Sequence, residues 1–211
     1  MKTIAIFGAS GATGQILVRQ ALNRGWQVNA LCRHRSALEG KDKKLLVYEG
    51  NITPEACKQV INDADSVICA LGQRPKAMQP FCADATTIIL QAMKECGVQR
   101  FICITGAMVG DRNEQSRSWF IQQMVKAFRK KMPQIAEDRV AQEKITATSS
   151  VKWTIVKPPR LSDSTIPKKV IAAESLPVTA FSSISRSNLA AYILSILDDS
   201  STIEKLLVVR S

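Results

Sequence analysis

Hydrophobic positions along this 211-residue chain fall into two patterns. Short apolar runs are typical of buried strands, and longer stretches with apolar residues three or four positions apart are typical of amphipathic helices. The runs predict strands at 4–7, 26–32, 44–49, 65–71, 100–105, 152–157, 170–172 and 206–209. The amphipathic stretches predict helices at 15–23, from Thr53-Pro54 onward, and at 81–96, 116–131, 134–148 and 185–197. Because strands and helices alternate, we expect one α/β domain over 1–211, with a doubly wound, mostly parallel sheet flanked by helices.

The turn after the first strand contains three glycines, Gly8, Gly11 and Gly14, in the spacing G-x-x-G-x-x-G. Gly8 would allow a sharp bend and Gly11 a close approach of the backbone to a pyrophosphate. Gly14 would allow tight packing of the next helix on the strand. The N–H groups at the start of that helix, around Ala12 and Thr13, would face the anion. The spacing differs from the common G-x-G-x-x-G motif, but the surrounding strand, helix and strand supply the context that a dinucleotide site requires. We therefore favour a nucleotide site, beside the expected strand-order switch between strands one and four, over an ordinary glycine-rich turn.

The end of the second predicted strand indicates which dinucleotide would bind. Proteins selective for NAD usually have an acidic residue there on the ribose 2′-hydroxyl, whereas this chain has Arg33-His34-Arg35. Paired arginines suit a 2′-phosphate, so we expect NADP(H) rather than NAD(H). His34 could be an exposed loop residue or could contact the adenine or the phosphate.

Net charge is +11, and it is uneven along the chain. Residues 112–169 hold 13 Lys or Arg against 5 Asp or Glu, an excess of eight positive charges. Such an excess attracts anions, whether phosphates, carboxylated small molecules or nucleic acid, and a solvated basic face is the simpler alternative. Nucleic acid ranks last, because the region lacks the interleaved aromatic residues of a base-stacking surface.

Composition bears on where the protein resides and on whether it spans a membrane, forms disulfides or binds a metal. No stretch approaches the ~18–20 apolar residues of a membrane span, and glycines interrupt the N-terminal apolar run too early for a signal peptide. The six cysteines form no C-x-x-C pair, and several lie in apolar runs, which favours buried free thiols in a reducing compartment. With a single histidine we expect no metal site. We expect a cytoplasmic monomer whose partner is a planar or anionic small molecule, not a membrane.

Four motifs point to a known family: 7–14 (FGASGATG), 71–74 (LGQR), 156–160 (VKPPR) and 184–189 (ISRSNL). With them, the chain resembles atypical short-chain dehydrogenases/reductases, and most closely the biliverdin reductase B or flavin reductase (NADPH) family, over essentially its whole length. The resemblance implies one Rossmann domain that binds NADPH and passes hydride to flavins or to tetrapyrroles such as biliverdin. Flavin would be a substrate rather than a tightly bound cofactor.

The glycine turn, the basic strand end and the family resemblance together imply a set of site residues. The cofactor would contact Gly8, Ser10, Gly11, Ala12, Thr13, Gly14, Arg33, Arg35, Asn51, Ile52, Leu71, Gly72, Arg74, Thr105 and Pro158. The substrate would contact Gly106, Ala107, Arg112 and Arg160. The longest irregular stretches, 106–115 and 160–184, are the expected substrate loops.

Typical short-chain dehydrogenases use a Tyr-x-x-x-Lys pair to relay a proton, and this chain has no such pair. Its only tyrosines are Tyr48, in a predicted strand, and Tyr192, in a predicted helix. The absence argues against alcohol and ketone chemistry, in which a carbonyl oxygen must be protonated. Flavin reduction tolerates the absence, since hydride goes to a ring nitrogen and water can supply the remaining proton. The alternative is a non-catalytic NADP(H)-binding redox sensor or assembly factor.

The chain also departs from the family near the substrate. Gly106 stands where the family has a serine, and Arg139, Glu143 and Arg160 stand where family histidines align. These changes leave the cofactor motifs intact and weaken the case for tetrapyrrole reduction. The arginines could hold a flavin phosphate or propionates. Arg139 could instead pair with Glu143 on its own helix, and Arg160 could be plain surface charge.

Overall fold

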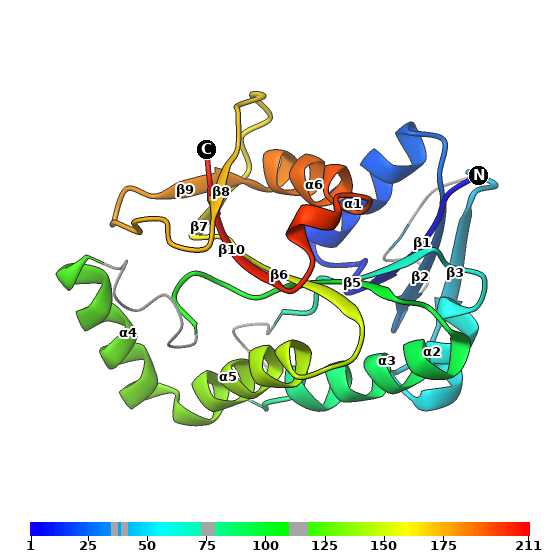
Figure 1. Cartoon of the computed structure of the whole chain (residues 1–211), viewed down its shortest axis with the longest axis horizontal. Coiled ribbons are helices and arrows are strands. Elements are labelled where there is room, and N and C mark those ends of the chain that lie inside the picture. The colour runs from blue at the N-terminus through cyan, green and yellow to red at the C-terminus, as the bar shows by residue number, and fades with distance from the viewer. Residues whose placement is uncertain (35–37, 39–41, 73–78, 110–117) are drawn as a thin grey trace.

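The computed structural model describes residues 1–34, 38, 42–72, 79–109 and 118–211. Within them, eight strands form one sheet in the order β3-β2-β1-β4-β5-β6-β10-β8 (Figure 1). The strands of this sheet are β1 (Thr3–Phe7), β2 (Gln27–Cys32), β3 (Leu45–Glu49), β4 (Ser66–Cys69), β5 (Arg100–Ile104), β6 (Lys152–Lys157), β8 (Ile171–Ala173) and β10 (Lys205–Arg210). The helices are α1 (Ala12–Asn23), α2 (Pro54–Ile61), α3 (Cys82–Cys96), α4 (Trp119–Lys131), α5 (Pro133–Ala147) and α6 (Arg186–Ser195), with a short 3-10 helix, η3 (Ser200–Thr202).

Strand β1 lies inside this sheet, between β2 and β4. Its neighbours run parallel to it, and Ile4 is opposite Val28 of β2 and Ser66 of β4. The chain order therefore reverses beside β1, as the sequence predicts. All but one pair of adjacent strands are parallel; the exception is β8, which pairs antiparallel with β10 at the edge.

Two helical layers cover the sheet, with α1 and α6 on one face and α2, α3 and α5 on the other (Figure 1). Strand β1 is buried along its whole length, because parallel strands carry helices on both faces. Ile4 and Ile6 pack on the α1–α6 side, whereas Ala5 and Phe7 pack on the other side. This alternation divides the core into two large clusters, one on each face.

The stretch 160–184 differs from the irregular loop expected from the sequence. Besides β8, which the sequence predicts, it contains β7 (Arg160–Ser162) and the start of β9 (Ser183–Ser185), and these two strands form a small parallel sheet. Each is three residues long, too short to show a periodic pattern. From the sequence, 206–209 is expected to close the sheet as its last strand; β10 is instead an interior strand, because β8 pairs with it and forms the edge. Helix α4 begins after Ser118, and 116–117 of the predicted helix lie outside the described residues.

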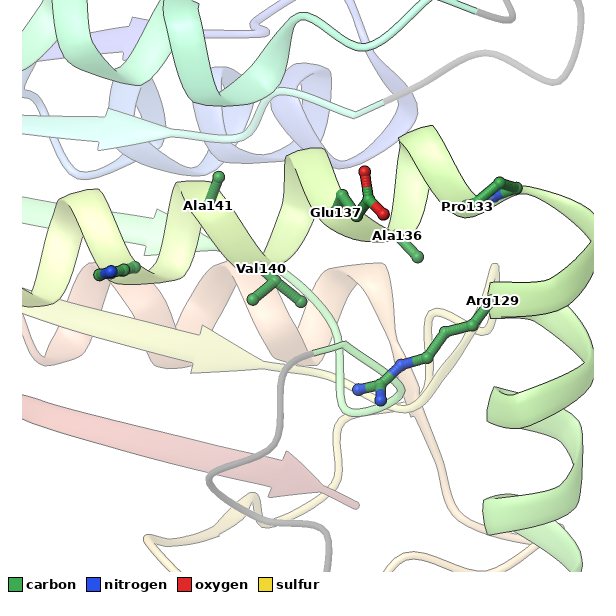
Figure 2. Close-up of a pocket in the computed structure, with 7 residues that line it drawn as sticks. Arg129, Pro133, Ala136, Glu137, Val140 and Ala141 are labelled. Atoms are coloured by element: carbon green, nitrogen blue, oxygen red, sulfur yellow. The ribbon is translucent and has the colours of Figure 1, made fainter.

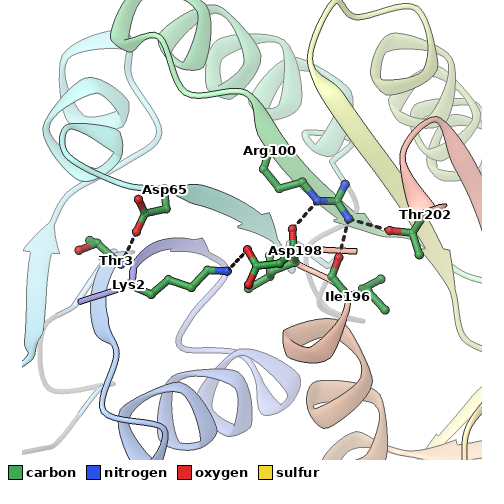
Figure 3. A network of polar contacts seen from close by, with 8 residues as sticks. Lys2, Thr3, Asp65, Arg100, Ile196, Asp198 and Thr202 are labelled. Atoms are coloured by element: carbon green, nitrogen blue, oxygen red, sulfur yellow. Dashed lines mark hydrogen bonds and ion pairs between the residues drawn. The ribbon is translucent and has the colours of Figure 1, made fainter. Parts of the chain in front are cut away.

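Polar side chains connect the amino edge of the sheet, by hydrogen bonds and an ion pair, to the segment after α6. Buried Arg100, at the start of β5, donates hydrogen bonds to the carbonyls of Leu197 (3.0 Å) and Ile196 (2.9 Å) and to the hydroxyl of Thr202 (3.0 Å) (Figure 3). Burial lowers the pKa of this guanidinium, and the negative charges of Asp199 and Asp198 oppose part of the shift. Lys2 pairs with Asp198 in the same region (Figure 3).

Helix α3 is capped from another helix. Asp138 of α5 accepts the N–H groups of Cys82 (3.1 Å) and Ala83 (2.9 Å), and more weakly that of Phe81 (3.3 Å). The carboxylate satisfies donors that the helix itself cannot bond, and its charge complements the helix dipole. This cap connects α5 to α3 beside the carboxyl edge of the sheet.

Among the described helices, none has the length and apolar character that crossing a membrane would require.

Candidate functional site

The turn after β1 is built around two glycines that no other residue could replace without movement. Gly8 has a φ of +80°, and a Cβ added there would lie 2.6 Å from the carbonyl oxygen of Ala70. A Cβ on Gly14 would lie 2.1 Å from the carbonyl oxygen of Gly8. Gly8 therefore permits the bend against β4, and Gly14 lets α1 pack directly on the turn.

The N-terminus of α1 is open toward solvent. Gly11 is its N-cap residue, and no side chain of the described residues caps the helix. The first turn contains no acidic residue, and both Gly11 and Ala12 are exposed, with Ser10 and Thr13 half-buried. A helix start with uncapped N–H groups and no negative charge of its own is suited to a phosphate. The turn therefore fits the pyrophosphate of a dinucleotide.

The carboxyl ends of β2 and β3 bring the predicted adenosine residues to the same edge. Arg33 directly follows β2 and is exposed, and exposed Asn51 and half-buried Ile52 follow β3. The N–H of Gly50 donates to the carbonyl of Cys32 (3.0 Å), which ties the two strand ends together. Arg35 lies outside the described residues.

Beyond β4, the chain passes close to helix α5. Leu71 is half-buried and Gly72 is exposed, and Arg74 lies outside the described residues. The guanidinium of Arg139 donates to the carbonyl of Leu71 (3.2 Å) and to the side-chain oxygen of Gln142 (2.7 Å). The pairing of Arg139 with Glu143 considered from the sequence is therefore wrong, because Glu143 is directed to another cation.

The ends of β5 and β6 are held together by backbone hydrogen bonds. The N–H of Thr105 donates to Val156 (3.1 Å), and the N–H of Ala107 donates to Pro158 (2.9 Å). Ala107 and Pro158 are both buried, so any contact they make with a ligand would be limited. Gly106 is half-buried, Arg160 is exposed at the start of β7, and Arg112 lies outside the described residues.

A buried ion pair lies directly behind Thr105. The ammonium of Lys157, at the end of β6, is 2.7 Å from Oε1 of Glu143 on α5, and their side chains are 0% and 8% exposed. The same Oε1 accepts a hydrogen bond from the Thr105 hydroxyl (2.7 Å). Lys157 also donates to the carbonyl of Val109. The three side chains connect β5, β6 and α5 at the carboxyl edge.

Sequence reasoning named Glu143 only as a position where a family histidine aligns and as a possible partner of Arg139, and Lys157 only as part of the 156–160 motif; it did not predict that the two pair. One signal was present: a lysine ends the apolar run of β6, and lysine is almost never fully buried unless it is paired. Its partner could not be found from the sequence, because Glu143 is on a helix whose orientation depends on the packing of α5 against the sheet.

A surface cavity of about 420 Å³ lies between α4 and α5 (Figure 2). Figure 2 shows Arg129 reaching from α4 toward Val140 of α5. The described residues that line it are Arg129, Pro133, Ala136, Glu137, Val140, Ala141 and Lys144. None of the site residues predicted from the sequence is among them, so this cavity is separate from the glycine turn and its neighbours.

Two similar proteins are themselves uncharacterised. The chain is 30% identical over 118 residues to an uncharacterised chloroplastic protein of Arabidopsis thaliana, covering 51% of this chain and 42% of that protein. The match thus spans less than half of that relative's length. It is 24% identical over 162 residues to the uncharacterised protein YwnB of Bacillus subtilis, covering 76% of this chain and 73% of that protein.

Solved structures share the fold over nearly the whole chain. A short-chain dehydrogenase/reductase from Veillonella parvula in complex with NADP has a TM-score of 0.84 at 16% identity, covering 100% of this chain and 94% of that one. ChuY, an anaerobillin reductase from Escherichia coli O157:H7, has a TM-score of 0.81 at 19% identity, covering 99% and 97%. A protein from Streptococcus pneumoniae proposed to be an NADH-flavin reductase has a TM-score of 0.78 at 20% identity, covering 100% of both chains.

The sequence profile of one family matches most of the chain. That family is described as NAD(P)H-binding, and the match runs over residues 8–200. It includes the glycine turn, the strand ends and the ion pair described above. The chain therefore belongs to the NAD(P)H-binding family.

Proposed function

We propose that this protein is an NADPH-dependent reductase that transfers hydride to flavins or related planar acceptors. The observation that carries the proposal is the uncapped start of α1, behind Gly8 and Gly14, on the same sheet edge as Thr105. A dinucleotide anchored at that turn would extend across the ends of β4 and β5, which is where ligands bind in open α/β sheets.

Contacts to the two ends of the dinucleotide are assigned from the strand order. The adenosine end would lie over β2 and β3, with the 2′-phosphate against Arg33, and Arg35 is proposed for the same role. Asn51 and Ile52 would face the adenine. The ribose and nicotinamide would lie along Leu71, Gly72, Thr105 and Pro158. Arg33 is the reason to prefer NADPH, since an exposed guanidinium binds a phosphate through charge-assisted hydrogen bonds.

NADPH would supply the hydride, and the chain's own residues would orient the acceptor. The Thr105 hydroxyl is bonded to Glu143, so it is not poised to protonate a carbonyl oxygen. Reduction at a flavin ring nitrogen avoids that need, and rate enhancement would come mainly from orientation at the sheet edge. Gly106 leaves space beside Thr105, because among the described residues a Cβ added there would meet nothing nearer than 3.7 Å.

One assay tests the activity. Purified protein with NADPH and FMN, riboflavin or biliverdin is followed at 340 nm, with acceptor-free protein as the blank. We expect turnover with a flavin. Absence of turnover with every acceptor, alongside tight NADPH binding in calorimetry, would contradict the reductase and support the alternative, a non-catalytic NADP(H)-binding sensor. That alternative is favoured by Gly106 and by the missing Tyr-x-x-x-Lys pair.

A companion variant tests the cofactor preference. Arg33→Ala should weaken NADPH binding by about tenfold or more and leave NADH binding nearly unchanged, because only NADPH carries the 2′-phosphate. Arg19→Ala is the matched control, since Arg19 is also exposed but lies along α1, away from the β2 end. Equal NADPH and NADH losses in Arg33→Ala would refute the assignment.

A further inference from the structure

The hydrogen-bond pattern around Thr105 restricts what this residue can offer a ligand. Lys157 has no exposed side-chain surface, so its charge requires an opposite charge beside it, and Glu143 supplies one at 2.7 Å. An ionised carboxylate only accepts hydrogen bonds. The single proton of the Thr105 hydroxyl is therefore committed to Glu143, at 2.7 Å.

At the Thr105 hydroxyl itself, only oxygen lone pairs remain available to a ligand. Three backbone donors around it are also committed: the N–H of Thr105 bonds to Val156, that of Ala107 to Pro158, and that of Val109 to Gly106. Position 106 has no side chain that could add a donor. The guanidinium of Arg139, which contacts the chain after β4, is bonded to Leu71 and Gln142.

We propose that Thr105, locked by Glu143 and Lys157, is an acceptor-only hydrogen-bond position that selects a ligand presenting an N–H group to the end of β5. The inference rests on the proposed dinucleotide and flavin site. Two ligands there carry such a donor: the carboxamide of the nicotinamide, and a ring N–H of the acceptor, such as the flavin imide. A bare carbonyl or an N-alkylated ring would place an acceptor or a methyl group against the Thr105 lone pairs.

In this proposal the buried ion pair of Glu143 and Lys157 has a role in ligand selection as well as in stability. A buried ion pair generally contributes little net stability compared with an apolar pair of the same shape. Here Glu143 and Lys157 are positioning residues, because they act on a ligand through the direction of the Thr105 proton. A neutral pair would let that hydroxyl rotate and donate.

Binding of matched ligand pairs tests the proposal without turnover. Dissociation constants are measured for lumiflavin and 3-methyllumiflavin, which lacks the imide N–H, and for NADP⁺ and its 3-acetylpyridine analogue, which lacks the carboxamide N–H. In wild-type protein we expect about a tenfold preference for the N–H member of one pair. The pair that shows it identifies whether the acceptor or the dinucleotide supplies the donor.

Variants connect the preference to the three residues. Thr105→Val, of similar shape, should abolish the preference, and Thr105→Ser should keep it. The double variant Glu143→Gln/Lys157→Met removes both charges together and should lower the preference to about twofold, because the hydroxyl can then donate. Should this double variant fail to fold, Thr105→Val against Thr105→Ser decides the question.

The proposal is overturned if wild-type protein binds both members of each pair within twofold, or if Thr105→Val keeps the wild-type ratio. These results are distinct from failure of the proposed function. A preference for NADP⁺ over its acetyl analogue with no flavin turnover would refute the reductase and support the acceptor position. Flavin turnover without any such preference would support the reductase and refute the acceptor position.

Discussion

Gly11 and Gly14 lie three residues apart in the turn after β1 and have different structural demands. A Cβ on Gly14 would overlap the carbonyl oxygen of Gly8 at 2.1 Å, whereas a Cβ on Gly11 would lie 3.3 Å from the same atom. Gly14 is buried and Gly11 is exposed. Gly14 is therefore required by the fold, while Gly11 is required only if something must approach the turn from solvent.

Substitution by alanine separates the two demands. Gly14→Ala should destabilise the protein by about 3 kcal/mol or more, since backbone must move to relieve the overlap. Gly11→Ala should change stability by no more than about 1 kcal/mol and still weaken NADPH binding several-fold, because the added methyl group points toward the proposed pyrophosphate. Urea unfolding and calorimetric titration measure the two effects. Unchanged NADPH affinity in Gly11→Ala would argue that the pyrophosphate does not bind at this turn.

Among elements, helix α5 makes the most varied contacts with the site. It caps α3 through Asp138, contacts the Leu71 carbonyl through Arg139 and holds Thr105 through Glu143. Several of its polar residues are buried, among them Gln142 and Thr146, so its sequence lacks a clean apolar stripe. Gln142 donates to Thr86 of α3, Asp138 caps α3, and the Thr146 hydroxyl donates to the Gln142 carbonyl of its own helix, so these buried polar groups are hydrogen-bonded.

Removing the Asp138 cap tests how strongly α5 and α3 are coupled. Asp138→Ala should reduce the free energy of unfolding by about 1–2 kcal/mol, as loss of a helix cap does elsewhere, and Asp138→Asn should cost less because an amide oxygen still accepts. Glu137→Ala, an exposed neighbour on the same helix, is the control. The measurement is chemical unfolding at neutral pH. If Asp138→Ala and Glu137→Ala behaved alike, the inter-helix cap would have no measurable effect.

At the scale of the whole molecule, the two edges of the sheet have different roles. The amino edge is closed by Arg100 and its carbonyl partners, and the carboxyl edge holds the open helix start and the residues proposed to bind ligands. All six cysteines are described and free, and all except Cys96 are buried between these edges and their covering helices. The fold thus keeps five of its six thiols away from water.

Buried thiols predict a loss of stability in alkali. Burial is the main cause that raises the pKa of Cys57 and of Cys82 to about 12, from an ordinary value of 9.0. At a pH between 9.0 and about 12, these two thiols are ionised in the unfolded chain and protonated in the folded protein. The unfolded state therefore binds fewer protons, and stability falls as pH rises, by about 1 kcal/mol per pH unit for each thiol.

The measurement is the free energy of unfolding from pH 7 to 11, for wild-type protein and for the double variant Cys57→Ala/Cys82→Ala. It checks whether these two thiols cause the alkaline loss of stability. The double variant should be less stable at pH 7 because of lost packing, and its stability should decline less steeply above pH 9. Parallel curves above pH 9 would show that these two thiols do not cause the alkaline loss.

The sequence by itself determined the order of the main helices and strands, the strand-order switch beside β1 and the glycine turn. These features depend on local periodicity, on glycine backbone freedom and on helix caps such as Thr53 and Ser185, all of which act over a few residues. NAD(P)H binding, predicted from the same turn, is confirmed by membership of the family. The preference for NADPH, the acceptor and the individual contacts stay predictions.

Only the tertiary structure decided which side chains meet. The partner of Lys157 is 14 residues away on α5, and Thr105 is 38 residues from Glu143, so no local pattern specifies the group. Three-residue strands such as β7 and β9 form only because the end of β6 and the start of α6 bring them together. Pairings of this kind depend on how separate elements pack, and burial then determines which charges must be matched.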